Sequence, residues 1–367
     1  MSGNESVRLE DLLPHEVAER WALSPIAYIP IGCIEYHGPH LPLGVDGFTA
    51  HAVCEKAARH SGGVVHPVSF MANGCLDLPY TITFPADVIE QWARAIIREL
   101  HRRGAELVVL LTGHGPLDLI HLLKRVCREF DEPGHRAYGL CYLELNAANL
   151  ESPELGEPTV IDHASTVETS WIMACRPELV ELERLPVDPE AQTLGVYGRN
   201  PRFTASAELG IRQQEHCAGL LARRARAMLA SDWSDTGEDL NTFVEFVWPE
   251  PLEVGTEVRD DICLAVIRNP GRASRYISSI ASVRVNGTPV DLTDATVVNR
   301  SAGEVGAPYA VAALSAENGI YVRRGQSIEV VASGLAGLST SDDIRITVEL
   351  AGVKMQELVS ATTVNHE

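Results

Sequence analysis

Basic residues are scarce in this chain of 367 residues, where 30 lysines and arginines stand against 50 aspartates and glutamates. The resulting net charge of -20 argues against nucleic acid and anionic membranes as partners, because phosphate groups are bound by an excess of basic side chains. No apolar run approaches the roughly 20 residues of a membrane span. The polar, acidic N-terminal segment lacks a secretion-signal pattern, which predicts a cytoplasmic protein.

None of the eight cysteines forms a Cys-x-x-Cys pair, the spacing typical of thiolate zinc sites and redox motifs. Most of them lie within apolar runs, which favours reduced cysteines of the core over disulfides or a zinc–thiolate site. Cys33 stands close to a cluster of ionisable residues, where a nucleophilic role is the alternative. Its neighbours Gly32 and Ile34 favour an inward position on a strand.

The first two thirds of the chain alternate continuous apolar runs with longer helical patterns. Such runs are typical of parallel strands covered on both faces, and the alternation predicts an α/β fold with a mostly parallel sheet. The helical pattern over 86–104 ends in a basic turn followed by Gly104, a typical helix end. The expected strands lie within 24–34, 105–113 and 137–145, and the expected helices within 47–62, 86–104, 117–134 and 205–232.

The pattern changes after Ser231. Residues 235–261 contain nine acidic residues and one basic residue, Arg259, which indicates a solvated linker leading into an edge strand. Short alternating runs follow, with hairpin signals at Asn286-Gly287 and Arg324-Gly325 and one-sided alternation in 344–350. We therefore expect an antiparallel β-sandwich over 240–367, separate from an α/β domain over 1–235. It would serve assembly or act as a lid; binding of carbohydrate or a partner is the alternative.

Ionisable residues crowd against the ends of two expected strands. Glu35 and His37 follow the first apolar run, and Asp46 comes nine residues later across a loop rich in glycine and proline. His114 stands between two glycines at the end of the second run. Ligands of open α/β sheets bind outside the carboxyl ends of the strands, so these side chains are expected at one edge.

A third segment, "DHASTVETS", adds Asp162, His163 and Glu168. Imidazole and carboxylate ligands suit zinc, manganese or iron(II), and this many suit a pair of ions bridged by a carboxylate and a water. Taken singly, each residue is also compatible with a hydrogen-bonded polar group or a helix cap. Spacing alone leaves both interpretations open.

The stretch "IGCIEYHGPHLPLGVDG" closely resembles the signature of the creatininase (creatinine amidohydrolase) family. "TGHG" and "DHASTVETS" resemble two further motifs of that family, in the same order, and the resemblance covers residues 8–231. It implies an α/β sandwich with a parallel sheet, assembly as a homo-oligomer, commonly a hexamer, and two divalent metal ions. It also implies hydrolysis of carbon–nitrogen bonds in a small-molecule amide, formamide or cyclic amide.

Carried over by position, the resemblance implies that Glu35, Asp46 and His114 hold one metal ion. His37, Asp46 and Glu168 would hold the other, so that Asp46 bridges the two ions. His163 would match the family's acid/base histidine. An imidazole that titrates near neutrality suits protonation of the leaving nitrogen. We therefore predict His163 and Glu168 as the catalytic residues.

Three departures from the family pattern argue against creatinine itself as the substrate. Pro116 and Leu117 replace a ligand-bearing loop, so that Glu168 must serve as ligand or Asp118 must reach in. The other residues that differ from the family pattern are also expected to line the site: Leu76, Asp77, Tyr80, Asp162 and Ser165. The alternative function is a catalytically inactive protein that keeps the fold for binding or assembly.

Overall fold

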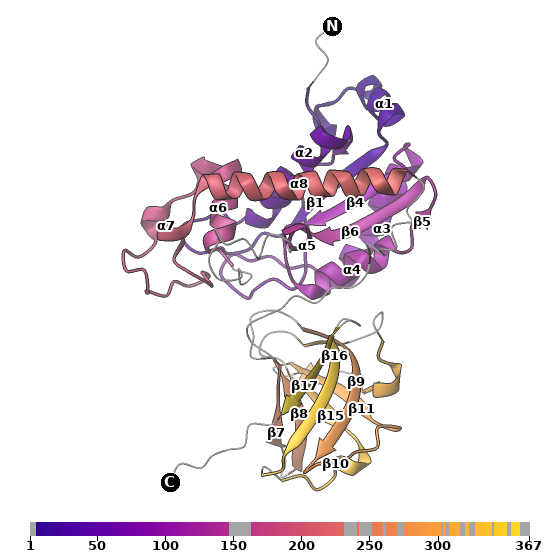
Figure 1. Ribbon diagram of the computed structural model, residues 1–367, viewed down its shortest axis with the longest axis vertical. Coiled ribbons are helices and arrows are strands. Elements are labelled where there is room, and N and C mark those ends of the chain that lie inside the picture. The colour runs from indigo at the N-terminus through magenta and orange to yellow at the C-terminus, as the bar shows by residue number, and fades with distance from the viewer. Residues whose placement is uncertain are drawn as a thin grey trace. The chain divides into compact units, whose positions relative to one another are not determined.

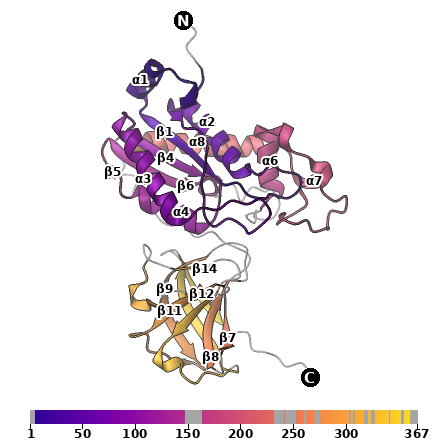
Figure 2. The ribbon, with the colours of Figure 1, turned by 180° about the vertical axis from the view of Figure 1, so that it is seen from behind.

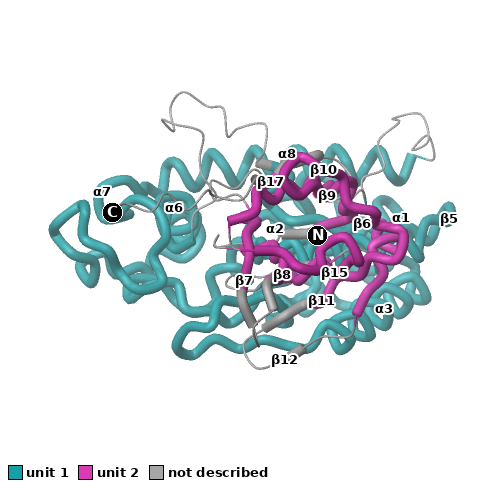
Figure 3. Tube along the Cα trace, turned by 90° about the horizontal axis from the view of Figure 1, so that it is seen from below, with its two compact units in different colours: residues 1–242 teal, residues 243–367 magenta. Residues whose placement is uncertain are grey.

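The computed structural model divides into two compact units, residues 1–242 and 243–367, which are coloured separately in Figure 3. The described residues are 5–146, 163–230, 241, 252–259, 262–269, 275–301, 304–305, 308–315, 320–322, 327–339, 341–350 and 354–359. Asp162, the turn at 324–325 and most of the acidic stretch at 235–261 lie outside these ranges.

The first unit is built on a six-stranded sheet with the order β2-β1-β4-β6-β5, with β3 also paired to β1. All pairings are parallel except that of β5 with β6, which confirms the mostly parallel sheet. The residues of β1 and β4 are buried throughout, as their continuous apolar runs predict. The strands are β1 (Ile26–Gly32), β2 (Val64–Val65), β3 (Ser69–Phe70), β4 (Leu107–Thr112), β5 (Asp131–Glu132) and β6 (His135–Cys141).

Helices cover both faces of this sheet. Helices α2 and α8 lie on the face seen in Figure 1, and α3 and α4 lie on the opposite face, seen in Figure 2. Helix α6 packs against both α2 and α8. The helices are α1 (Pro14–Leu23), α2 (Val45–Ser61), α3 (Ala86–Arg102), α4 (Leu117–Cys127), α5 (Tyr142–Asn146), α6 (Thr166–Cys175), α7 (Pro201–Thr204) and α8 (Ala207–Leu229). None of the described helices is long and apolar enough to span a bilayer.

The apolar run over 137–145 is only half a strand. Strand β6 ends at Cys141 and α5 begins at Tyr142, because the Glu144 carboxylate accepts a hydrogen bond from the Cys141 amide and caps the new turn. The expected helix at 86–104 is confirmed as α3, and Gly104 has the left-handed backbone (φ 111°) that its role as a helix end predicts.

The second unit consists of two antiparallel sheets, which confirms the predicted class of this part of the chain. Their inward residues form one shared hydrophobic core, for example Ile267 and Val297 of one sheet with Val283 and Ile346 of the other. The first sheet contains β9 (Arg275–Val285), β10 (Thr288–Pro289), β14 (Ile320–Val322), β16 (Ile344–Leu350) and β17 (Lys354–Val359). The second contains β7 (Glu253–Arg259), β8 (Ile262–Arg268), β11 (Thr296–Ser301), β12 (Glu304–Val305), β13 (Tyr309–Ala310) and β15 (Ser327–Val331).

One of the two predicted hairpins is confirmed and the other is wrong. Asn286 and Gly287 both have positive φ and join β9 to β10, as an Asn-Gly turn requires. In the described residues, the strands on either side of Arg324-Gly325, which are β14 and β15, do not pair with each other. Strand β14 pairs with β9, whereas β15 pairs with β8 and β11 in the other sheet. The alternating pattern thus predicted two strands correctly, but it could not predict which strands they pair with.

The side chain of Asn241 completes the open edge of β6. Its amide oxygen accepts a hydrogen bond from Gly139 N at 2.9 Å, and its amide nitrogen donates to Ala137 O at 3.1 Å. The side-chain amide thereby satisfies two buried backbone groups of β6 that a neighbouring strand would otherwise satisfy. Asn241 therefore belongs to the first unit, although it lies in the stretch expected to link the two domains.

We expect Asn241→Ala to lower the free energy of unfolding by about 1–3 kcal/mol, because it leaves two buried backbone groups without these partners. Denaturation followed by tryptophan fluorescence measures this, since Trp171 is buried in the first unit. Asn241→Asp keeps an acceptor for Gly139 N but turns a second carboxylate oxygen toward Ala137 O in place of the donor, so it should destabilise the protein at least as much as Asn241→Ala. Equal stability of all three proteins would contradict the assigned role.

Candidate metal centre

The carboxyl ends of β1 and β4 deliver the first ligand candidates. Glu35 and His37 follow the end of β1 at Gly32, and His114 follows the end of β4 at Thr112. The two strands are adjacent and parallel, so their ends meet at one edge of the sheet, as the sequence predicts. The Thr112 hydroxyl donates to His114 O and accepts from His114 N, which fixes the turn that carries this imidazole.

Asp46 enters the same place from the first turn of α2. The loop before it folds back and is closed by a hydrogen bond from Glu35 N to Leu43 O. A Cβ atom on Gly32 would lie 2.2 Å from Gly47 N, and one on Gly113 would lie 2.0 Å from Asp46 O. Only glycine allows the two strand ends to approach the start of α2 so closely, and this approach places the Asp46 carboxylate between them.

His163 and Glu168 come from the segment that leads into α6. Ala164 adopts the left-handed conformation (φ 53°), and its amide donates to Glu168 Oε2 at 2.6 Å. His163 is held by backbone hydrogen bonds with Tyr197. Its ring stacks on His37, with 4.2 Å between the centroids. The turn thus directs both residues toward the strand ends.

His37, Asp46 and Glu168 form one candidate metal-binding group, called here the His37 group. His37 Nε2 lies 3.4 Å from Asp46 Oδ1 and 3.5 Å from Glu168 Oε2. His37 Nδ1 lies 3.0 Å from Glu35 O, and donating to that carbonyl leaves the Nε2 lone pair facing two carboxylates. Such an arrangement is repulsive unless a cation, either a proton or a metal ion, lies between these atoms.

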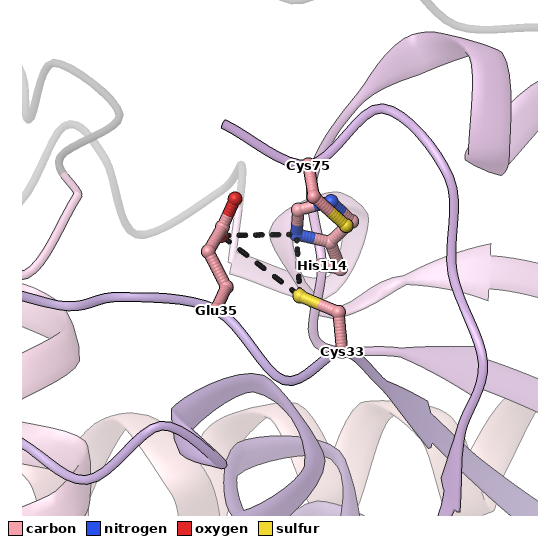
Figure 4. Close-up of side chains that lie close together, drawn as sticks. All are labelled: Cys33, Glu35, Cys75 and His114. Carbon is pink, nitrogen blue, oxygen red and sulfur yellow. Dashed lines mark hydrogen bonds and ion pairs between the residues drawn. The ribbon is translucent and has the colours of Figure 1, made fainter. Parts of the chain in front are cut away.

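Cys33, Glu35, Cys75 and His114 form a second group, the His114 group (Figure 4). His114 Nδ1 lies 3.6 Å from Glu35 Oε2 and 3.1 Å from Asp46 Oδ2. Asp46 therefore presents one carboxylate oxygen to each group, which is the geometry of a bridging ligand. Four buried residues, Glu35, His37, Asp46 and His114, supply most of these atoms.

The two cysteines are the members of this cluster that sequence reasoning assigned to the core. Cys33 is buried, as expected, but it also faces the ionisable residues, because positions 33 and 35 lie on the same side of an extended chain. The alternation of side chains along an extended chain could therefore have indicated that Cys33 faces the same side as Glu35. Cys75 gave no such signal, because it arrives on the loop after β3, where Leu76 N donates to the Glu35 carboxylate. All seven cysteines with described side chains are free.

The charges of the cluster shift several pKa values. Burial alone would lower the pKa of His37, but Asp46 and Glu168 outweigh it and raise this pKa to about 10. Burial would raise the pKa of Asp46, yet His37 and His114 bring it well below its usual range. Burial and the positive charge of His37 lower the pKa of His163 to about 3. His163 is therefore a neutral imidazole, rather than one that titrates near neutrality.

His40, from the loop between His37 and Asp46, and several residues named from the sequence lie outside the two groups. His40 is buried, and its Nε2 lies 3.0 Å from Thr169 Oγ1, so it ties the loop to α6. Asp118 is buried in the first turn of α4 and belongs to none of the candidate metal groups among the described residues, whereas Glu168 does. Asp77 and Tyr80, which we expected to line the site, are exposed, and the Ser165 hydroxyl donates to Arg199 O.

Comparison with known proteins gives a consistent match. The model of the family described as creatinine amidohydrolase (creatininase) matches residues 10–228. A creatinine amidohydrolase of Pseudomonas putida is 28% identical in an alignment of 182 residues that covers 45% of this chain and 70% of that protein. A 3-dehydro-scyllo-inosose hydrolase of Thermotoga maritima is 26% identical over 48% of this chain and 58% of its own length. The structure of a zinc–zinc form of a creatininase variant matches 62% of this chain and 99% of its own, with a TM-score of 0.51 and 25% identity.

Uptake of metal should release protons. Near neutral pH, the metal-free protein carries a proton on His37, because its pKa is about 10, and an ion bound at Nε2 must displace that proton. We expect about one proton released for the ion in the His37 group, and metal affinity that rises from neutral pH toward pH 10. Titration in weak buffer with a pH indicator measures the release. Uptake without proton release, or affinity independent of pH, would contradict the protonated His37.

Proposed function

Since the chain belongs to the creatininase family of metal-dependent amidohydrolases, we propose that it hydrolyses a carbon–nitrogen bond with two divalent ions. The substrate class is a small amide, formamide or cyclic amide other than creatinine, and the ions are zinc, manganese or iron(II). A homo-oligomer, as the family resemblance implies, and a cytoplasmic location are part of the same proposal. The observation that carries the proposal is the position of Asp46, whose two carboxylate oxygens lie 3.4 Å from His37 Nε2 and 3.1 Å from His114 Nδ1.

The residues present fit a pair of ions. His37 Nε2 is buried without a hydrogen-bond partner among the described residues, and it faces two carboxylates. Glu35 and His114 would hold one ion, His37 and Glu168 the other, and Asp46 would bridge them. Bound there, the ions would supply an activated water and polarise the carbonyl of the substrate. All of these residues belong to the first unit.

In this proposal His163 moves a proton at the centre, and its hydrogen bonding supports that role. Its Nε2 lies 3.0 Å from Tyr36 O, and donation to that carbonyl leaves Nδ1 as the acceptor, 3.9 Å from Glu35 Oε2. A neutral imidazole with its lone pair toward the ligands can accept a proton from the attacking water. The same atom then donates that proton to the leaving nitrogen, so one side chain serves as base and as acid in turn.

Metal analysis of Asp46→Asn tests the bridge. We expect the variant to lose both ions, because one carboxylate serves both groups, whereas wild-type protein holds about two. Asp118→Asn is the matched control, because it changes another buried carboxylate at a helix start and should keep both ions. Loss of a single ion from Asp46→Asn would show that Asp46 does not bridge. Wild-type protein without metal would favour the inactive binding protein.

His163→Gln should keep both ions and lower turnover by roughly 10²–10⁴-fold, the usual contribution of general acid–base catalysis. The substrate for this assay comes from a screen of small amides, formamides, lactams and hydantoin-like rings against metal-loaded protein. Cyclic ketones are included, because the Thermotoga relative is named for such a compound. His40→Gln is the control, since it alters a buried imidazole outside both groups. Loss of metal from His163→Gln would make His163 a ligand instead.

A further inference from the structure

The sulfur of Cys33 lies among the atoms that would hold the ion of the His114 group. Cys33 Sγ is 2.8 Å from Asp46 Oδ2, 3.5 Å from His114 Nδ1 and 3.9 Å from Glu35 Oε2. Figure 4 shows the sulfur turned toward Glu35 and His114 from the end of β1. A cysteine that only filled the core would have no need to face three ionisable side chains.

The separations of these four atoms fit a tetrahedral donor set. Ligands about 2.0–2.3 Å from a zinc ion at tetrahedral angles lie roughly 3.3–3.6 Å from one another. Five of the six separations range from 2.8 to 3.9 Å around those values, including 3.1 Å and 3.6 Å from His114 Nδ1 to Asp46 and Glu35. Cys33 Sγ and His114 Nδ1 therefore lie at the separation expected of two ligands that share one ion, and each also lies within 4 Å of both carboxylate oxygens.

We propose that Cys33 is a thiolate ligand of the ion in the His114 group, which makes this half of the centre selective for thiophilic ions. The inference rests on the proposed two-ion function and adds the chemistry that selects one of the ions. Thiolate ligands favour zinc, cobalt(II) and iron(II) over manganese, whose preferred donors are oxygen atoms. The thiol loses its proton when the ion binds, as a ligating cysteine does.

Cys75 belongs to the same group, but it is not the ligand that we assign. Its ligand atom lies within 4.8 Å of those of Cys33, Glu35 and His114. Its sulfur also lies 3.8 Å from Ile82 O and 4.0 Å from Ala72 O, so backbone carbonyls are within reach of this thiol. Cys75 therefore provides a matched control, a second thiol at the same place that differs in its contacts.

Cobalt(II) provides a readout that is independent of activity. Full-length protein stripped of metal is titrated with cobalt(II), and ion content is measured together with the near-ultraviolet sulfur-to-cobalt charge-transfer band. We expect uptake of about two ions and the band in wild-type protein. We expect the band to persist in Cys75→Ser and to disappear in Cys33→Ser and Cys33→Ala. Both Cys33 substitutions should also shift the preference of the site from zinc toward manganese by about tenfold or more.

The outcomes separate this inference from the proposed function. Uptake of two ions without the band, or a band that survives both substitutions of Cys33, overturns the thiolate ligand and leaves the two-ion centre standing. A band lost only in Cys75→Ser overturns the assignment to Cys33. Absence of cobalt uptake overturns both proposals. Circular dichroism of each variant verifies that it is folded, and Cys33→Ala and Cys33→Ser differ in polarity, so agreement between them excludes a packing defect.

Discussion

The approach of helix α2 to the ends of β1 and β4 is the constraint on which the rest of the centre depends. It places Asp46 between His37 and His114, with one carboxylate oxygen toward each. The approach is possible because Gly32 and Gly113 have no side chain where the backbone of α2 passes. An oriented carboxylate at a helix N-terminus is also favoured by the helix dipole, so fold and charge act in the same direction.

The cluster is costly to the fold without its cations. Glu35, Asp46 and Glu168 bring three carboxylates into an environment nearly closed to water, and the fold balances them with imidazoles. Protonation of His37 provides one way to neutralise them, and metal ions provide the other. A site of this kind favours divalent ions, because a bound ion takes over the neutralisation of the three buried carboxylates from the protonated imidazole. Binding energy and folding energy are thereby linked.

The first unit carries every residue of this centre, and the second unit contributes a separate antiparallel core. Within the first unit, contacts distant in sequence complete the structure. Asn241 fills the open edge of β6 from a position 102 residues beyond its partner Gly139, and Glu168 joins the His37 group from α6. The centre therefore depends on the long-range order of the whole first unit, rather than on the local motif around Glu35 alone.

The sequence by itself determined the fold class, the three longest strands and the four longest helices of the first unit, and most of the cluster. Buried strands leave continuous apolar runs, and a parallel sheet brings their carboxyl ends together, so Glu35, His37 and His114 could be placed from chain order. Only the tertiary structure decided which strands pair with β14 and which pair with β15. The same holds for the turn into α5 after Cys141 and for the position of Cys75 beside Glu35. Local patterns show which residues avoid water, but they carry no information on which distant residue fills the adjoining space. Local patterns also could not predict the exposure of Tyr80 or the low pKa of His163, because both depend on residues distant in the sequence.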